Sequence, residues 1–204
     1  MSEIKNHGKS IRARLLNVAK QEEVFYQTIL TRYFQERLLY RISQTRYREN
    51  FYLKGGALMY AYERFAARPT LDIDFLGTRI SNDGERIAEA FREICSVDCK
   101  EDGVQYDCDK IVTQNITEFK DYHGVRLSIP VTMDTIAQVL TMDVGFGDVV
   151  TPHPVALDYP LLLEDLPEAS ILAYSTETVI AEKMHAIIDL ADQSSRMKDY
   201  YDIY

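Results

Sequence analysis

Residues 51–77 read FYLKGGALMYAYERFAARPTLDIDFLG. The apolar residues at 51–54 predict a short strand, which the glycine pair Gly55-Gly56 interrupts. Helical spacing then predicts a helix over 56–66, and alternation predicts a second strand over 71–76. Because side chains alternate across a strand, Asp72 and Asp74 share one face while apolar residues occupy the other. This layout suits the binding of phosphate and a metal.

Each half of this stretch has a functional and an ordinary interpretation. Two carboxylates about 7 Å apart on one strand face repel each other, and a divalent cation is the simplest compensation. Glycines lack a Cβ, so the backbone N–H groups of Gly55 and Gly56 and the start of the next helix can approach an anion. Alone, the glycine pair is more often a plain turn and Asp-x-Asp a solvated strand face. Their proximity in the sequence strengthens the functional interpretation of both.

The composition is that of a soluble globular protein, with 204 residues, 46% of them hydrophobic and 27% charged. The N-terminus is polar and no run of 18 apolar residues occurs, so we expect no signal peptide, no membrane contact and a cytoplasmic location. Cys95, Cys99 and Cys108 lack the spacing of a zinc site and are interpreted as free thiols.

The net charge of −9 is unevenly distributed. Residues 1–50 contain ten Lys and Arg against five Asp and Glu, whereas the rest contains 13 against 27. Such a basic segment can follow a nucleic-acid backbone that an acidic domain would otherwise repel. Equally, its side chains can form the solvated faces of two amphipathic helices. Both interpretations stay open for Arg12, Arg14, Lys20, Arg32, Arg37, Arg41, Arg46 and Arg48.

The remaining elements follow from periodicity. Apolar spacing predicts helices over 8–20, 21–45 and about 84–96, and alternation predicts strands near 104–106, 110–117, 124–132 and 136–146. The last strand carries Asp143, a third acid for the sheet. The Pro- and Leu-rich residues 151–174 are expected to be a connection that crosses the surface. A group of acids is expected in a solvated hairpin, namely Glu101, Asp102, Asp107 and Asp109.

A further helix is predicted over about 176–191, with Lys183 on or beside its apolar stripe. A lysine there can extend its amine to solvent, or it can neutralise phosphate in an adjacent site. Residues 196–204 have a helical pattern that stops in mid-helix without a cap or glycine, so we expect the natural protein to continue past residue 204.

Four motifs together resemble a known family. KGGAL at 54–58 and RPTLDIDF at 68–75 look like the signature of the AbiEii/AbiGii toxin-type nucleotidyltransferases, within the DNA-polymerase-β-like superfamily. ETVIAEK at 177–183 and RMKDYYD at 196–202 are similar to the two downstream motifs of that family, in the same order. The matches span roughly three quarters of the chain.

The resemblance implies an α+β fold, with a nucleotidyltransferase-like mixed β-sheet flanked by helices. Periodicity adds an N-terminal helical pair and a C-terminal helical segment to this core. We therefore expect a basic helical segment over 1–50 packed on a nucleotidyltransferase core over 51–150, followed by a C-terminal helical segment over 151–204.

The resemblance also implies roles for individual residues. Lys54, Gly55, Gly56, Arg68 and Thr70 would bind the nucleotide. One feature departs from the family pattern, because Ala57 stands where members commonly have Thr or Ser, so phosphate contacts there rest on the backbone. Catalysis would involve Asp72, Asp74, Asp143, Lys183 and Asp199, and metal would bind Asp72, Asp74 and Asp143.

The implied activity is that of a bacterial toxin from a toxin–antitoxin or abortive-infection system. It would transfer a nucleotidyl group from a nucleoside triphosphate (NTP) to RNA, such as a tRNA 3′ end, with two Mg²⁺ ions at the carboxylates. A cognate antitoxin, which need not touch the toxin, would be its partner. Two alternatives stay open: a protein or small-molecule acceptor, and a non-catalytic nucleic-acid-binding module.

Overall fold

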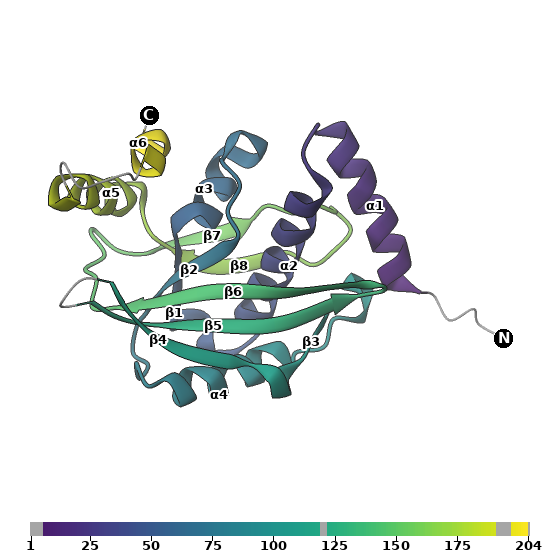
Figure 1. The fold of residues 1–204 in the computed structure, drawn as a ribbon, viewed down its shortest axis with the longest axis horizontal. Coiled ribbons are helices and arrows are strands. Elements are labelled where there is room, and N and C mark those ends of the chain that lie inside the picture. Colours follow the sequence, from purple (N-terminus) through teal and green to yellow (C-terminus); the bar gives the residue numbers. More distant parts are fainter. Residues whose placement is uncertain (1–5, 119–121, 191–196, 204) are drawn as a thin grey trace.

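The computed structural model describes residues 6–118, 122–190 and 197–203. Within them the chain forms a mixed sheet flanked by helices, which confirms the α+β prediction (Figure 1). The strands are β1 (Phe51–Lys54), β2 (Asp72–Gly77), β3 (Gln105–Tyr106), β4 (Val112–Glu118), β5 (Tyr122–Met133), β6 (Ile136–Phe146), β7 (Val155–Tyr159) and β8 (Ala169–Ala173).

The order of the strands places the acidic strand in the middle of the sheet. It runs β3-β5-β6-β2-β1-β8-β7, with β4 also paired to β5. The β2–β6 and β1–β8 pairs are parallel, and the others are antiparallel. Ile73 and Phe75 of β2 are buried, as the alternating pattern predicts. The opposite face of β2 is therefore the one that carries Asp72 and Asp74.

Six helices surround the described part of the sheet. They are α1 (His7–Gln21), α2 (Tyr26–Ser43), α3 (Gly55–Glu63), α4 (Gly84–Cys95), α5 (Thr176–Leu190) and α6 (Met197–Ile203). The side chain of Asp83 caps α4 by accepting a hydrogen bond from the Arg86 N–H, and Ile87 and Phe91 bury its inner face. In Figure 1, α5 and α6 lie together at one end of the sheet, next to α3.

Helix α2 has charged residues in the protein interior, which neither interpretation of the basic segment predicted. Arg32, Arg37 and Arg41 are 3%, 0% and 2% exposed, so they neither line a nucleic-acid surface nor form a solvated face. Arg37 Nη1 donates to the Pro167 carbonyl at 3.0 Å, and Arg32 Nη2 donates to the Ala67 carbonyl at 3.0 Å. Buried polar groups need such partners. These arginines hold loops in place.

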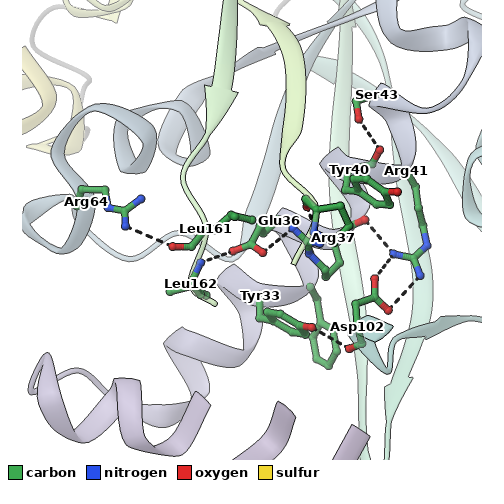
Figure 2. Close-up of polar contacts among 12 residues, drawn as sticks. Tyr33, Glu36, Arg37, Tyr40, Arg41, Ser43, Arg64, Asp102, Leu161 and Leu162 are labelled. Carbon is green, nitrogen blue, oxygen red and sulfur yellow. Dashed lines mark hydrogen bonds and ion pairs between the residues drawn. The ribbon is translucent and has the colours of Figure 1, made fainter. Parts of the chain in front are cut away.

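Figure 2 shows two further contacts of α2 with the loops around it. The Glu36 carboxylate accepts the Leu162 N–H at 2.8 Å and pairs with the Arg37 guanidinium at 2.7 Å. Arg41 Nη1 donates to Asp102 Oδ2 at 2.7 Å. Loops more than 60 residues away in the sequence are thus tied to one helix.

Asp102 corrects the prediction of a solvated acidic hairpin. Its side chain is fully buried, where it pairs with Arg41 and accepts a hydrogen bond from the Val104 N–H at 2.8 Å. Asp107 and Asp109 remain at the surface, where Lys110 pairs with Asp107 at 2.7 Å. One acid of the group therefore belongs to the core.

The prediction that residues 151–174 are a surface connection is wrong. They contain β7 and β8, and β8 lies parallel to β1 with Tyr52 opposite Leu172. Ala169, Ile171 and Ala173 are buried, so alternate residues of β8 face the core. Prolines flanking these short strands gave the stretch the composition of a loop.

Cys95, Cys99 and Cys108 are free thiols, as expected. Across the described part of the chain, no helix has both the length and the apolar character needed to span a bilayer.

Candidate active site

The glycine turn joins β1 directly to α3. Lys54 ends the strand, and Gly55 has a positive φ of 66°, a conformation that other residues rarely adopt. A Cβ on Gly55 would lie 2.0 Å from Asp74 Oδ2, and a Cβ on Gly56 would lie 2.8 Å from the Thr70 Cβ. The two glycines therefore allow the start of α3 to approach Asp74 and Thr70 closely.

Strand register aligns four charged residues across the centre of the sheet. Lys54 of β1 lies opposite Asp74 of β2, Asp74 opposite Asp143 of β6, and Asp143 opposite Arg126 of β5. Register partners project from the same face of a sheet. The third acid that the sequence predicted therefore lies on the neighbouring strand, directly beside Asp74.

The environment of Asp74 disfavours its negative charge. Burial raises the pKa of this carboxyl to about 6, the carboxylates of Asp143 and Asp72 act in the same direction, and the Lys54 amine opposes them. A cation near these oxygens would relieve the repulsion. Carboxylate oxygens, such as those of Asp72 and Asp74, are the hard donors that Mg²⁺ prefers. Among the described residues, no three potential ligands already form a compact metal cluster.

Asp143 has a partner of its own. The Arg126 guanidinium binds it with two hydrogen bonds, from Nε to Oδ1 at 2.7 Å and from Nη2 to Oδ2 at 2.6 Å. Such a paired geometry holds a carboxylate in a defined orientation. Asp143 therefore lies in the row of carboxylates with both oxygens engaged by Arg126.

Lys54 contacts carboxylates from two later parts of the chain. Its Nζ lies 2.8 Å from Asp148 Oδ2, just after β6, and also pairs with Glu182 of α5. The Tyr174 hydroxyl donates to the same Asp148 oxygen at 2.8 Å. Lys54 thereby connects the glycine turn to α5.

Lys183 is buried, so its amine does not extend into solvent. Its Nζ lies 2.6 Å from Asp202 Oδ2 and 3.6 Å from Asp199 Oδ1, both on α6. Arg68 donates from Nε and Nη2 to the two oxygens of the same Asp202, at 2.9 and 3.0 Å. The two downstream motifs and the loop before β2 therefore meet at Asp202.

The site residues expected from the sequence thus form two neighbouring groups. Lys54, Gly55, Gly56, Thr70, Asp72, Asp74 and Asp143 gather at the centre of the sheet, and Arg68, Lys183 and Asp199 gather around α6. Sequence reasoning did not assign roles to four of their partners: Arg126, Asp148, Glu182 and Asp202. Glu182 and Asp202 lie within the two downstream motifs, whereas nothing in the local pattern distinguishes Arg126 from a solvated strand arginine.

Comparisons with solved structures match this fold. JHP933 from Helicobacter pylori has a TM-score of 0.56 at 16% identity, and the match covers 86% of this chain and 64% of that one. A proposed nucleotidyltransferase from H. pylori has a TM-score of 0.52 at 15% identity, covering 86% of this chain and 66% of that one. The chain thus spans just under two thirds of either protein.

Among curated proteins, none matches the chain significantly. A family model described as nucleotidyl transferase AbiEii toxin, type IV toxin–antitoxin system, matches residues 37–204. The match begins within α2 and includes the glycine turn, all three central carboxylates and both downstream motifs. The chain therefore belongs to the AbiEii family of nucleotidyltransferase toxins.

Proposed function

We propose that this protein transfers a nucleotidyl group from an NTP to a hydroxyl of RNA, such as a tRNA 3′ end, as the toxin of a type IV toxin–antitoxin system. The observation that carries the proposal is the contact between the glycine turn and the acidic strand. Gly55 lacks the Cβ that would collide with Asp74, so a helix N-terminus and a carboxylate face lie side by side. Triphosphate and metal are bound by these two kinds of group.

Asp72 and Asp74 are the residues that would hold Mg²⁺, with Asp143 beside them. The raised pKa of Asp74 supports this assignment, because the neighbouring carboxylates are poorly compensated without a cation. Bound Mg²⁺ would neutralise charge on the phosphates and lower the pKa of the attacking hydroxyl.

The other residues would bind and orient the donor. Backbone N–H groups of Gly55 and Gly56 would bind phosphate oxygens, with Thr70 adjacent to them. Lys183 lies buried between two α6 carboxylates, and we propose that its amine contacts phosphate when nucleotide binds. Lys54 and Arg68 would act mainly through the carboxylates they bind, since Lys54 contacts Glu182 and Arg68 contacts Asp202.

The proposed reaction is a displacement at the α-phosphorus of the NTP. The acceptor oxygen forms a bond to the α-phosphorus, the bond from that phosphorus to the oxygen bridging to the β-phosphate breaks, and pyrophosphate leaves. The hydroxyl proton passes to a carboxylate, for which Asp143 and Asp199 are the candidates. Holding the donor and the acceptor hydroxyl in line contributes as much to the rate of transfer as any single side chain.

RNA is proposed as the acceptor on the family resemblance and not on the basic N-terminal segment, since three of its arginines are buried. An RNA substrate would place the reaction in the cytoplasm. Because the toxin acts on a nucleic acid, its cognate antitoxin could counteract it without contact, and we propose this mode.

The proposal can be tested by incubating the protein with Mg²⁺, total RNA and each α-labelled NTP in turn. We expect ribonuclease-sensitive label with the wild type and none with a folded Asp72→Asn variant. Asp158→Asn is the matched control, because it changes an exposed strand carboxylate on β7 and should keep the label. Full labelling by Asp72→Asn would overturn the proposal, and label that survives ribonuclease would assign a protein or small molecule as acceptor.

A further inference from the structure

A cavity of about 420 Å³ opens between the connection that follows β6 and the first half of α5. Asp148 and Val149 line it from the connection, Tyr174 from the end of β8, and Glu177, Ala181 and Glu182 from α5. The volume lies within the range of small-molecule sites in proteins. It is large enough for a ribose and a base together.

The cavity adjoins the glycine turn through Lys54. The Lys54 amine contacts both Asp148 and Glu182, which belong to the cavity wall. Lys54 also immediately precedes Gly55 and lies opposite Asp74 in the sheet. A ligand anchored by its phosphates at the glycine turn can therefore reach the cavity by passing the Lys54 side chain.

The chemistry of the wall suits a neutral ring better than an anion. The wall has three carboxylates, those of Asp148, Glu177 and Glu182, and His185 and the Lys54 amine offset their charge in part. The remaining negative charge repels phosphate, so the charged part of a ligand stays at the glycine turn. The Tyr174 ring is 1% exposed and is covered by the Lys54 amine at 5.4 Å, so it belongs to the wall behind the cavity, whereas Val149 is 82% exposed at the rim. Exposed apolar surface such as that of Val149 can pack against a flat heterocycle.

The same carboxylates select among heterocycles by hydrogen bonding. Lys54 contacts one oxygen of Asp148 and one of Glu182, and a carboxylate can accept about four hydrogen bonds. Adenine, guanine and cytosine each carry an exocyclic amino group that donates to such acceptors. Uracil has no amino group, and its one Watson–Crick donor, N3–H, lies between two carbonyl oxygens that the carboxylates repel.

We propose that this cavity holds the nucleoside part of the NTP and favours bases with an exocyclic amino group over uracil. The inference rests on the proposed function, because the triphosphate must first be bound at the glycine turn. It adds to that function that Asp148, Glu177 and Glu182 select which NTP is bound.

Calorimetry with Mg²⁺ can separate the two sites, using inorganic tripolyphosphate as the probe of the glycine turn and the four NTPs as probes of both. Ala181→Phe fills the cavity from an exposed position on α5. Ile180→Phe adds the same ring one residue earlier, at a position 46% exposed that does not line the cavity. It is therefore the matched control.

We expect Ala181→Phe to weaken ATP, GTP and CTP binding by about tenfold, because the added ring occupies the space of the nucleoside, and to leave tripolyphosphate binding unchanged. UTP should bind the wild type most weakly, and Ile180→Phe should bind all ligands as the wild type does. Unchanged NTP binding by Ala181→Phe, an equal loss of tripolyphosphate binding, or UTP binding as tight as that of the other NTPs would overturn the inference. Absence of Mg²⁺-dependent binding of every probe to the wild type would overturn the proposed function, and the inference with it.

Discussion

Replacing Gly55 with alanine places a methyl group where Asp74 already lies. The new Cβ would be 2.0 Å from Asp74 Oδ2, 2.7 Å from its Cγ and 2.9 Å from its Cβ, whereas real Cβ contacts essentially never fall below 3.0 Å. Either Asp74 or the start of α3 must therefore move by about 1 Å. Both belong to the proposed donor site, so the substitution tests the close approach directly.

The cost has two sources. A non-glycine residue at the Gly55 φ of 66° loses about 1–2 kcal/mol, and overpacking loses typically about 1–3 kcal/mol more. We expect Gly55→Ala to lower the free energy of unfolding by about 2–5 kcal/mol in urea denaturation. A displacement of about 1 Å at the reacting groups should also lower the rate of nucleotidyl transfer by about a hundredfold.

Gly147→Ala is the matched control. Gly147 also has a positive φ, of 93°, but a Cβ added there would meet no atom within 4 Å beyond its chain neighbours. It should therefore lose only the backbone contribution, about 1–2 kcal/mol, and keep the transfer rate of the wild type. If Gly55→Ala unfolds like Gly147→Ala and transfers nucleotide at the same rate, the close approach of Asp74 has no functional importance.

Three further predictions concern buried charge. Asp102→Ala should lower the free energy of unfolding by about 3–5 kcal/mol in urea denaturation, because it leaves Arg41 buried without its carboxylate. Burial raises the pKa of Glu36 from its usual 4.5 to about 7, so the folded state keeps a proton that the unfolded chain releases in this range. The free energy of unfolding should therefore fall as pH rises from 4.5 to 7, and Glu36→Gln should remove that part of the decline. Asp202→Ala removes the carboxylate that Lys183 contacts, and amide hydrogen exchange in α6 should become about tenfold faster or more.

Each of these has a measurement that would contradict it. For Asp102, the control is Lys110→Ala, which breaks an exposed pair and should cost less than about 1 kcal/mol; equal losses would refute the distinction between the two pairs. For Glu36, identical pH profiles of wild type and Glu36→Gln would contradict the raised pKa. For Asp202, the control is Asp165→Ala, which removes the partner of Arg14, and α6 protection unchanged in Asp202→Ala would show that the contact does not hold the helix.

The elements that carry the centre of the candidate site were predictable because their signals are local. The glycine pair, the alternation around Asp72 and Asp74, and the position of Asp143 in an apolar strand each depend on a few adjacent residues. Periodicity therefore indicated β1, α3, β2 and β6 correctly. Register could not be predicted, although it is register that aligns Lys54, Asp74 and Asp143.

The buried charges were not predictable for the opposite reason. Arg41 looks like a solvated arginine until Asp102, 61 residues later, is placed beside it. Likewise, β8 is a short strand in a Pro-rich region, and its assignment depends on pairing with β1 more than 100 residues earlier. Composition and spacing describe neighbours along the chain, and they contain no information on such distant partners.

The charged interior of α2 has a consequence for the timing of folding during synthesis. Glu36 accepts a hydrogen bond from the Leu162 N–H, 126 residues further along the sequence. Arg37 donates one to the Pro167 carbonyl, 130 residues further along. At roughly 5–20 residues per second, the ribosome takes on the order of 10 s to supply these partners. Until then α2 cannot be buried without leaving charges unsatisfied. Strands β1, β2 and β6 of the candidate site leave the ribosome earlier, so α2 cannot complete its packing until the chain has emerged past residue 167.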